Sequence, residues 1–280
     1  LEEIHNPTDD QSLKNAIYRL KFDEHFFLQL LMALKKCYHE NNIGKTFSER
    51  GKYEKDIFES LDFNLTNAQI RVLKEIRKDL ISKKPMNRLI QGDVGSGKTI
   101  VAILASAIVI SHGSQVAVMA PTEILAEQHY HNFIKFCEPA SINIDLITGK
   151  LNKKDKLNKK NQLESGKIQL IIGTHALIQD QIKFNDLGMI IVDEQHRFGV
   201  KQRKSLIEKG YFPEVLALTA TPIPRTLAFT IHGDMEISWI DEMPQNRQQI
   251  ITKMINCNNI TEVYNNMREQ MDKGNHCYIV

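Results

Sequence analysis

The sequence predicts an α/β fold in which a mainly parallel sheet is covered by helices on both faces. From about residue 61 onward, short apolar runs alternate with helix-length amphipathic segments, which is typical of strands buried on both faces. A glycine-rich turn follows the first of these runs, and a pair of acids ends a later one. Because ligands of such sheets bind at the carboxyl ends of the strands, both features are expected at one edge.

Length and composition narrow the class of protein. The chain has 280 residues, of which 42% are hydrophobic and 25% charged, enough for one complete α/β domain plus parts of others in a soluble globular protein. The net charge of +2 gives no global signal of nucleic-acid binding. The four cysteines are widely spaced without a Cys-x-x-Cys pair, which argues against zinc and disulfides and favours reduced thiols in a cytoplasm.

Membrane association and obligate assembly are not expected. The most apolar run, Ile100 to Ile110, is too short to span a bilayer, and the first seven residues lack the basic start and apolar core of a signal peptide. Nothing calls for an obligate oligomer. We therefore expect a cytoplasmic monomer with no membrane role.

The first 60 residues are expected to be an N-terminal helical linker segment. Between Asp9 and Glu40, leucines, isoleucines and phenylalanines recur at three- and four-residue steps, which predicts a helix with a packing face. Residues 41–62 are polar and contain two glycines, so they are interpreted as a loop or linker. A domain boundary is placed near Leu61.

Six apolar runs are the expected strands of the domain at residues 61–240. They are Arg88–Gln91, Gln115–Ala120, Ile142–Ile147, Ile168–Ile172, Met189–Val192 and Val215–Leu218. Residues 241–280 are expected to hold a link and the truncated start of a second domain, with strands at Gln249–Ile255 and His276–Val280 around a helix at Thr261–Asp272. Since the last strand ends without a turn or cap, we expect the chain to be a piece of a larger protein.

The glycine-rich turn predicts triphosphate binding. It reads Gly92-Asp93-Val94-Gly95-Ser96-Gly97-Lys98-Thr99 and fits G-x-x-x-x-G-K-[ST]. In such a turn the backbone N–H groups bind phosphate oxygens, the lysine reaches the β/γ end, and the threonine hydroxyl reaches Mg²⁺. The strand before it and the apolar helix after it are the required context. ATP and Mg²⁺ are therefore the expected cofactors.

The acids Asp193 and Glu194 end the apolar run Ile190-Ile191-Val192. An isolated Asp-Glu pair is by default a solvated strand end, but the buried run and the upstream turn favour a chemical role. Asp193, with Thr99, is predicted to bind Mg²⁺, while Glu194 orients or deprotonates the attacking water, so that Lys98 and Glu194 are the catalytic candidates. A lone histidine such as His196 is more often structural.

Further motifs lie around these acids in a specific order. They are Leu65-Thr66-Asn67-Ala68-Gln69, Ala120-Pro121-Thr122-Glu123-Ile124-Leu125-Ala126-Glu127-Gln128-His129, Gly173-Thr174-His175-Ala176, Asp193-Glu194-Gln195-His196 with Arg197 to Arg203, and Leu218-Thr219-Ala220-Thr221-Pro222 to Leu227. With them the chain resembles, from near its start to its end, the RecG family of branched-DNA helicases in helicase superfamily 2. The resemblance implies a RecA-like first motor domain and, as partner, branched double-stranded DNA at stalled replication forks and Holliday junctions, in recombination and repair.

The resemblance also implies roles for particular residues. Gln69 would read the adenine, and the turn from Gly92 to Thr99 would bind the triphosphate. Thr219 and Thr221, with His196, would couple nucleotide state to DNA grip. The residues expected to face the DNA are Pro121, Thr122, Thr174 and His175. From the residues alone, Gln69 is a polar group at a helix start and the threonine pair a strand end with local hydroxyl bonds, and both interpretations stay open.

Three alternative functions fit the sequence less well than a RecG-like helicase: a transcription-repair coupling factor, an RNA helicase and a non-hydrolysing nucleotide switch or scaffold. A transcription-repair coupling factor typically has a second acid at the position of Gln195 and a bulky residue at the position of Ser96, so both residues of this chain favour RecG instead. The tract at 233–244 also resembles the RecG link between motor halves. An RNA helicase is disfavoured by the tract from Arg197 to Arg203, and a non-hydrolysing nucleotide switch or scaffold by the complete set of site residues.

One motif is expected to have no chemical role. The run from Lys150 to Lys160 is strongly basic and has no interleaved aromatic residues, so it is interpreted as a solvated helix face.

The resemblance places further parts of the motor outside this chain. The transition-state arginine of the second motor half and the wedge domain would both lie elsewhere. The 280-residue chain is therefore expected to bind ATP–Mg²⁺ weakly and to hydrolyse it very slowly.

Overall fold

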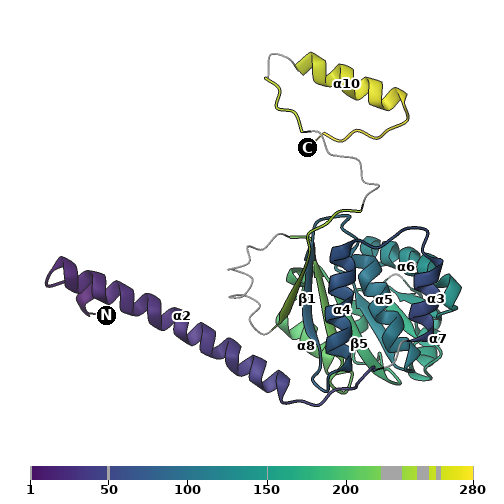
Figure 1. Cartoon of the computed structure of the whole chain (residues 1–280), viewed down its shortest axis with the longest axis horizontal. Helices are drawn as coiled ribbons and strands as arrows, with labels where there is room; N and C mark the ends of the chain where they lie inside the picture. The colour runs from purple at the N-terminus through teal and green to yellow at the C-terminus, as the bar shows by residue number, and fades with distance from the viewer. Residues whose placement is uncertain are drawn as a thin grey trace. The chain divides into compact units, whose positions relative to one another are not determined.

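The computed structural model describes residues 2–48, 51–149, 151–221, 235–244, 252–256 and 260–279. These residues form two compact units, Leu1–Pro244 and Gln245–Val280. The helices of the first unit are α1 (Glu2–His5), α2 (Asp10–Glu40), α3 (Lys52–Ser60), α4 (Asn67–Ile81), α5 (Lys98–Ser111), α6 (Glu123–Cys137), α7 (Lys153–Glu164) and α8 (Val200–Ile207), with short 3₁₀ turns η1 (Glu138–Ala140), η2 (His175–Ile178) and η3 (Gln195–Arg197) (Figure 1).

Seven parallel strands form one sheet in the order β3-β4-β2-β5-β6-β1-β7. Their bounds are β1 (Asn87–Gly92), β2 (Gln115–Met119), β3 (Ile144–Ile147), β4 (Leu170–Gly173), β5 (Leu187–Asp193), β6 (Glu214–Thr219) and β7 (Glu236–Ile240). The six strands expected from the sequence are all present, and each end lies within two residues of the expected one. The α/β fold class is therefore confirmed.

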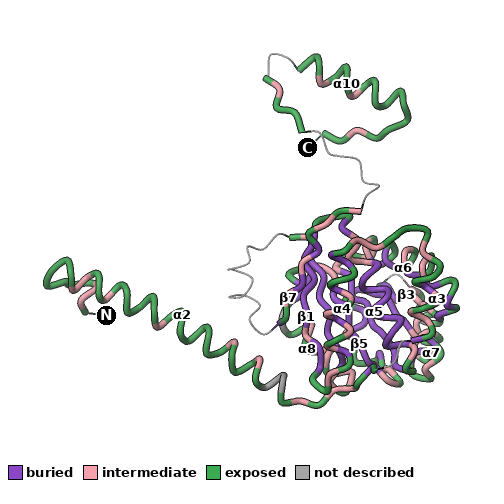
Figure 2. The backbone as a smooth tube through the Cα atoms, in the orientation of Figure 1, coloured by how far each residue is buried: buried purple, intermediate pink, exposed green. Residues whose placement is uncertain are grey.

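The sheet is buried on both faces because its side chains alternate between two cores. Val116 and Val118 of β2 belong to the core under α3, α4, α5 and α6, whereas Ala117 and Met119 belong to the core under α7, α8 and η2. This is the two-residue period of a strand. Helix α5 is buried along its apolar length from Ile100 to Ile110, and the strands around it are buried too (Figure 2).

The interpretation of residues 41–62 as a loop or linker holds for residues 41–48, which form no helix or strand, but is wrong for the second half of the segment. Helix α3 occupies Lys52–Ser60, Ile57 is fully buried, and the backbone N–H of Tyr53 donates to Ser111 Oγ of α5 at 3.2 Å. A Cβ on Gly51 would lie 2.3 Å from Ser111 Oγ, so the glycine permits this close approach. A nine-residue helix is marginal alone, and its tertiary partner, α5, stabilises it.

The long N-terminal helix is confirmed as α2, but its apolar side chains do not form the packing face that we expected. Tyr18, Phe27 and Leu34 are all exposed, and other apolar side chains of α2 are exposed or half-buried. In the part of the chain that the structure describes, α2 therefore contributes no residue to the buried cores.

Strand β7 is an addition to the six expected strands. It pairs in parallel with β1 at the edge of the sheet, and its burial alternates irregularly over Glu236–Ile240. The sequence places this segment in the tract interpreted as a link. A mixed polar and apolar edge strand has no long apolar run, so it gives a weak signal.

The second unit contains α10 (Ile260–Asp272), which agrees with the helix expected at Thr261–Asp272. The strands expected on either side are not formed at residues 252–255 or 276–279, while residues 249–251, at the start of the first, and residue 280, at the end of the second, lie outside the described residues. A strand needs a paired neighbour. The domain boundaries inferred from the sequence stay predictions.

Two further expectations concern surfaces. The lysine-rich helix α7 is exposed at many positions, as expected for a solvated helix face. Lys156, Lys159 and Lys160 are instead half-buried and donate to Gln179, Asp145 and Gln181 respectively, so this part of the prediction is wrong. Among the helices described, none combines the length and apolar character needed to span a bilayer.

Candidate active site

The glycine-rich turn connects β1 to α5 at the carboxyl edge of the sheet. Gly95 and Gly97 have φ of 82° and 85°, a left-handed conformation that glycine adopts without steric cost. The Ser96 N–H donates to the Asp93 carbonyl at 3.1 Å. The first amides of α5 have no carbonyl partner within the helix and carry its positive dipole end. The turn thus has the geometry of an anion-binding loop.

Gln69 joins α4 to this turn. Its side chain completes a capping box with Thr66 at the start of α4, and its Nε2 donates to the Ser96 carbonyl at 2.8 Å. The residue is 2% exposed. A Cβ on Gly97 would lie 2.2 Å from this Nε2. Gln69 therefore lies against the turn, and its role in reading adenine stays a prediction.

Lys98, the first residue of α5, lies close enough to the two acids to interact with their charges. Its Nζ donates to the carbonyls of Gly92 at 2.6 Å and Asp93 at 2.9 Å. Burial lowers the pKa of Lys98, and the charges of Glu194, Asp193 and Asp93 oppose that shift. An interaction of this kind falls off with distance, so the lysine and the two carboxylates share one local electrostatic environment.

The topology explains why segments almost a hundred residues apart meet. β6 lies between β1 and β5, with Gln91 of β1 opposite Thr219 of β6, and Asp193 of β5 opposite Leu218. All three strands are parallel, so their carboxyl ends lie side by side. The turn, the Thr219 segment and the acid pair are therefore neighbours at one edge.

Glu194 has a strained backbone and several contacts. Its φ of 48° is left-handed, a conformation that costs a non-glycine residue roughly 1–3 kcal/mol. Its carboxylate accepts from Thr219 Oγ1 and from the Ala220 N–H, both at 3.2 Å, and His196 Nδ1 lies 3.5 Å from Oε2. The Thr221 N–H in turn donates to Thr219 Oγ1 at 3.2 Å. Of the three predicted coupling residues, Thr219 and His196 thus lie beside the Glu194 carboxylate, and Thr221 is connected to it through Thr219.

Asp193 has a partner that the sequence did not indicate. Its Oδ2 lies 2.8 Å from His129 Nε2 of α6, and both side chains are largely buried. The two residues are 64 positions apart. His129 ends the motif that begins at Ala120, yet nothing in that pattern shows which group it contacts.

The residues predicted to face DNA differ in their exposure. Thr122 is exposed and caps α6 by accepting from the Leu125 N–H at 3.3 Å. Pro121 is half-buried and His175 is exposed. Thr174 is 2% exposed, and its buried hydroxyl has no hydrogen-bond partner within the described residues. DNA would therefore reach the Thr174 hydroxyl only after a local rearrangement.

The donor chemistry at this edge fits Mg²⁺. Asp193 supplies a carboxylate and Thr99 a hydroxyl, and hard oxygen ligands of this kind suit Mg²⁺. Over the residues that the structure describes, no group of three or more His, Cys, Asp or Glu side chains could hold a metal by itself. A Mg²⁺ that shares its coordination with phosphates and water needs only one or two protein carboxylates.

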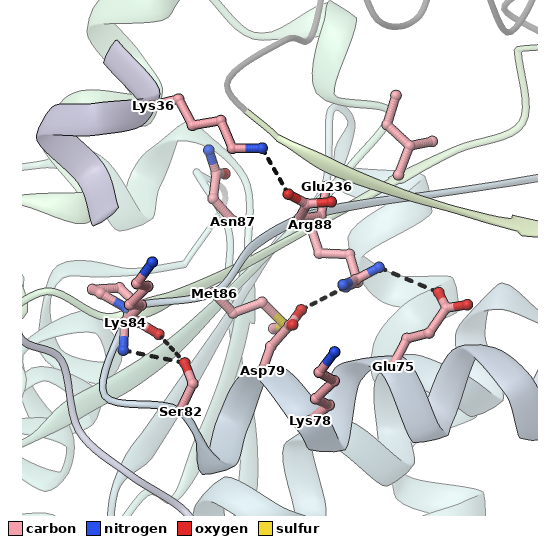
Figure 3. Close-up of a pocket in the computed structure, with 12 residues that line it drawn as sticks. Lys36, Glu75, Lys78, Asp79, Ser82, Lys84, Met86, Asn87, Arg88 and Glu236 are labelled. Carbon is pink, nitrogen blue, oxygen red and sulfur yellow. Dashed lines mark hydrogen bonds and ion pairs between the residues drawn. The ribbon is translucent and has the colours of Figure 1, made fainter. Parts of the chain in front are cut away.

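A separate cavity of about 550 Å³ lies at the opposite, amino end of β1 and β7 (Figure 3). Arg88 in its wall donates to Asp79 at 2.6 Å, Ser238 at 2.7 Å and Glu75 at 3.2 Å. Lys36 of α2 donates to Glu236 at 2.8 Å. The guanidinium is thus bonded to neighbouring side chains, and the cavity has none of the site residues predicted from the sequence.

The fold and the grouping of Lys98, Asp193 and Glu194 define the class: a phosphate-loop, RecA-like nucleotide-binding motor domain. A comparison with protein families matches residues 66–229 to the DEAD/DEAH box helicases, which is more than half of the chain. The chain therefore belongs to the DEAD/DEAH box helicase family.

Comparison with individual proteins shows which helicases this chain is similar to over its whole length. The chain is 46% identical to "ATP-dependent DNA helicase RecG" of Aquifex aeolicus and 43% identical to that of Bacillus subtilis, in both cases over 100% of this chain. It spans 36% and 41% of those relatives, respectively. Among solved structures, "Structure of RecG bound to three-way DNA junction" matches 94% of this chain and 36% of its own, with a TM-score of 0.83 and 41% identity. The resemblance to RecG stated from the motifs is thereby confirmed.

Proposed function

We propose that this chain is the ATP-binding half of an ATP-dependent DNA helicase that acts on branched DNA, such as stalled replication forks and Holliday junctions. The observation that carries the proposal is that the phosphate loop after β1 and the acids Asp193 and Glu194 after β5 lie at the same edge of the sheet, with only β6 between the two strands. The similarity to RecG proteins over the whole chain supports the DNA substrate. A cytoplasmic location and a monomeric state belong to the same proposal.

In the proposed reaction the phosphate loop binds the triphosphate, with the N–H groups of residues Gly92 to Thr99 directed at its oxygens. Lys98 moves from the Gly92 and Asp93 carbonyls to the β/γ-phosphates, where its charge offsets that of the transferred group. Asp193 and Thr99 would hold Mg²⁺, which would supply a further positive charge to neutralise the phosphate oxygens. These residues act by positioning and electrostatics rather than by covalent chemistry.

Glu194 is the proposed base that orients or deprotonates the attacking water. Its two oxygens already accept from Thr219 and Ala220, so a movement of that segment changes the position of the base. We propose that this contact couples the binding and hydrolysis of ATP to the affinity of the protein for DNA. The left-handed backbone of Glu194 is consistent with strain stored at a functional residue.

The test uses the full-length protein and measures steady-state ATP hydrolysis in the presence of a three-way DNA junction, linear duplex DNA or single-stranded RNA. Each nucleic acid is supplied at the same concentration of its own nucleotide units. The junction is expected to stimulate hydrolysis most. Stimulation by RNA equal to that by the junction would favour an RNA helicase. Hydrolysis that is independent of any nucleic acid would refute the helicase proposal.

A further inference from the structure

His129 is a buried polar side chain that no part of the proposed reaction uses. It lies on α6, is 9% exposed, and its Nε2 is 2.8 Å from Oδ2 of Asp193 at the end of β5. Among the described residues, His129 is the one hydrogen-bond partner of the Asp193 carboxylate. The contact connects α6 to the carboxyl end of β5.

The surroundings of the ring indicate which nitrogen bears the proton. His129 Nδ1 is buried and has no hydrogen-bond partner within the described residues. A proton on Nδ1 would bury an N–H without an acceptor, which costs about 1–3 kcal/mol. The proton is therefore assigned to Nε2, which donates to Asp193 Oδ2.

We propose that His129 is a positioning residue for Mg²⁺ binding: it binds one oxygen of Asp193 and leaves the other directed at the metal. This inference rests on the proposed function, because it assumes that Asp193 binds Mg²⁺ with the nucleotide. A carboxylate has two equivalent oxygens and a broad, two-fold side-chain torsion. A donor fixed on Oδ2 removes that rotation and presents Oδ1 in one orientation.

The expected magnitude follows from the behaviour of groups that orient metal ligands. Loss of such a partner typically weakens metal affinity about 10–100-fold. A purely structural role for His129 predicts a different outcome, in which stability falls and nucleotide binding weakens equally with and without metal. The positioning role and the purely structural role of His129 therefore differ in how nucleotide binding depends on Mg²⁺. A loss of nucleotide affinity by itself does not distinguish them.

The experiment measures binding of a fluorescent, non-hydrolysable ATP analogue to the 280-residue chain, first in EDTA and then across a Mg²⁺ titration. His129→Phe keeps a ring of similar size and removes the donor, whereas His129→Gln keeps an N–H donor of similar reach. His131→Ala, at an exposed position on the same helix, is the matched control. Thermal unfolding of each variant shows that it is folded.

We expect His129→Phe to raise the Mg²⁺ concentration at the binding midpoint about 10–100-fold with little change in EDTA. His129→Gln should restore most of the shift, and His131→Ala should match the unsubstituted chain. A Phe variant with an unchanged midpoint would overturn the positioning role, as would equal weakening in EDTA and Mg²⁺. If the Phe variant does not fold, a Gln variant with a raised midpoint equally overturns it. An unsubstituted chain whose nucleotide binding ignores Mg²⁺ would instead overturn the proposed function, and this inference with it.

Discussion

Glu214, at the start of β6, is the most unusual carboxyl group of the described fold. It is fully buried, its Oε2 accepts from the Met86 N–H, and its Oε1 has no partner within the described residues. Burial raises the pKa of Glu214 to about 8 from 4.5, with Asp79 adding to the rise and the Met86 N–H opposing it. The carboxyl group is therefore favoured in its neutral form in the folded protein.

The sign of the pH effect follows from this raised pKa. Since the folded pKa exceeds the unfolded one, the stabilising contribution is complete below pH about 4.5 and is lost as the pH rises through about 8. At about 1.4 kcal/mol for each pKa unit, the loss is on the order of 5 kcal/mol. Glu214→Gln removes the titrating group, so the variant lacks this loss.

Urea denaturation followed by circular dichroism between pH 5 and 9, values that bracket the pKa of about 8, gives the free energy of unfolding of each protein. The stability of Glu214→Gln minus that of the unsubstituted chain should increase by several kcal/mol from the acidic to the alkaline end. Burial of the new amide changes the free energy of unfolding by the same amount at every pH, so it does not affect how this difference varies with pH. Glu164→Gln, at an exposed position, is the control. A difference for Glu214→Gln that does not change with pH would refute the reasoning.

Three further predictions concern the nucleotide pocket. Glu194→Gln in the full-length protein should lower turnover about 10²–10⁴-fold, because it removes the proposed base, and should keep nucleotide affinity; a nucleotide switch would show little change in turnover. Gly97→Ala should weaken nucleotide binding at least about tenfold, roughly 1.4 kcal/mol, because its Cβ would lie 2.2 Å from Gln69 Nε2. Gly113→Ala is the matched control, since Gly113 has a similar φ but nothing within 4 Å, and this variant should bind nucleotide as the unsubstituted chain does. Equal weakening by both substitutions would assign the effect to backbone strain. The 280-residue chain alone should hydrolyse ATP about 10³–10⁵-fold more slowly than the full-length protein, because the resemblance places the transition-state arginine outside it; equal rates would contradict this.

Much of the sheet and the pocket could be predicted because their signals are local. An apolar run followed by a turn with glycines at fixed positions predicts β1, the phosphate loop and α5 with no knowledge of their neighbours. The acids Asp193 and Glu194 end a run of residues buried on both faces, which marks the carboxyl end of a strand. Parallel strands then place all of these groups at one edge.

The errors at α3, β7 and the expected last strand concern segments whose structure depends on a partner. Helix α3 depends on α5, and β7 depends on β1. The strand expected at residues 276–280 has no paired neighbour and is not formed in its described part. Such segments have few apolar residues or too short a pattern, so their stability is set by contacts distant in sequence.

The sequence alone determined the order of the strands along the chain, the anion-binding loop and the identity of the charged groups in the pocket, since these depend on residue type and spacing. Only the tertiary structure decided that β6 lies between β1 and β5, that Glu194 accepts from Thr219 and Ala220, and that His129 contacts Asp193. Pairs of this kind join residues 25 to 64 positions apart. Their contact is a consequence of how the strands and helices pack, and that packing has no local pattern in the chain.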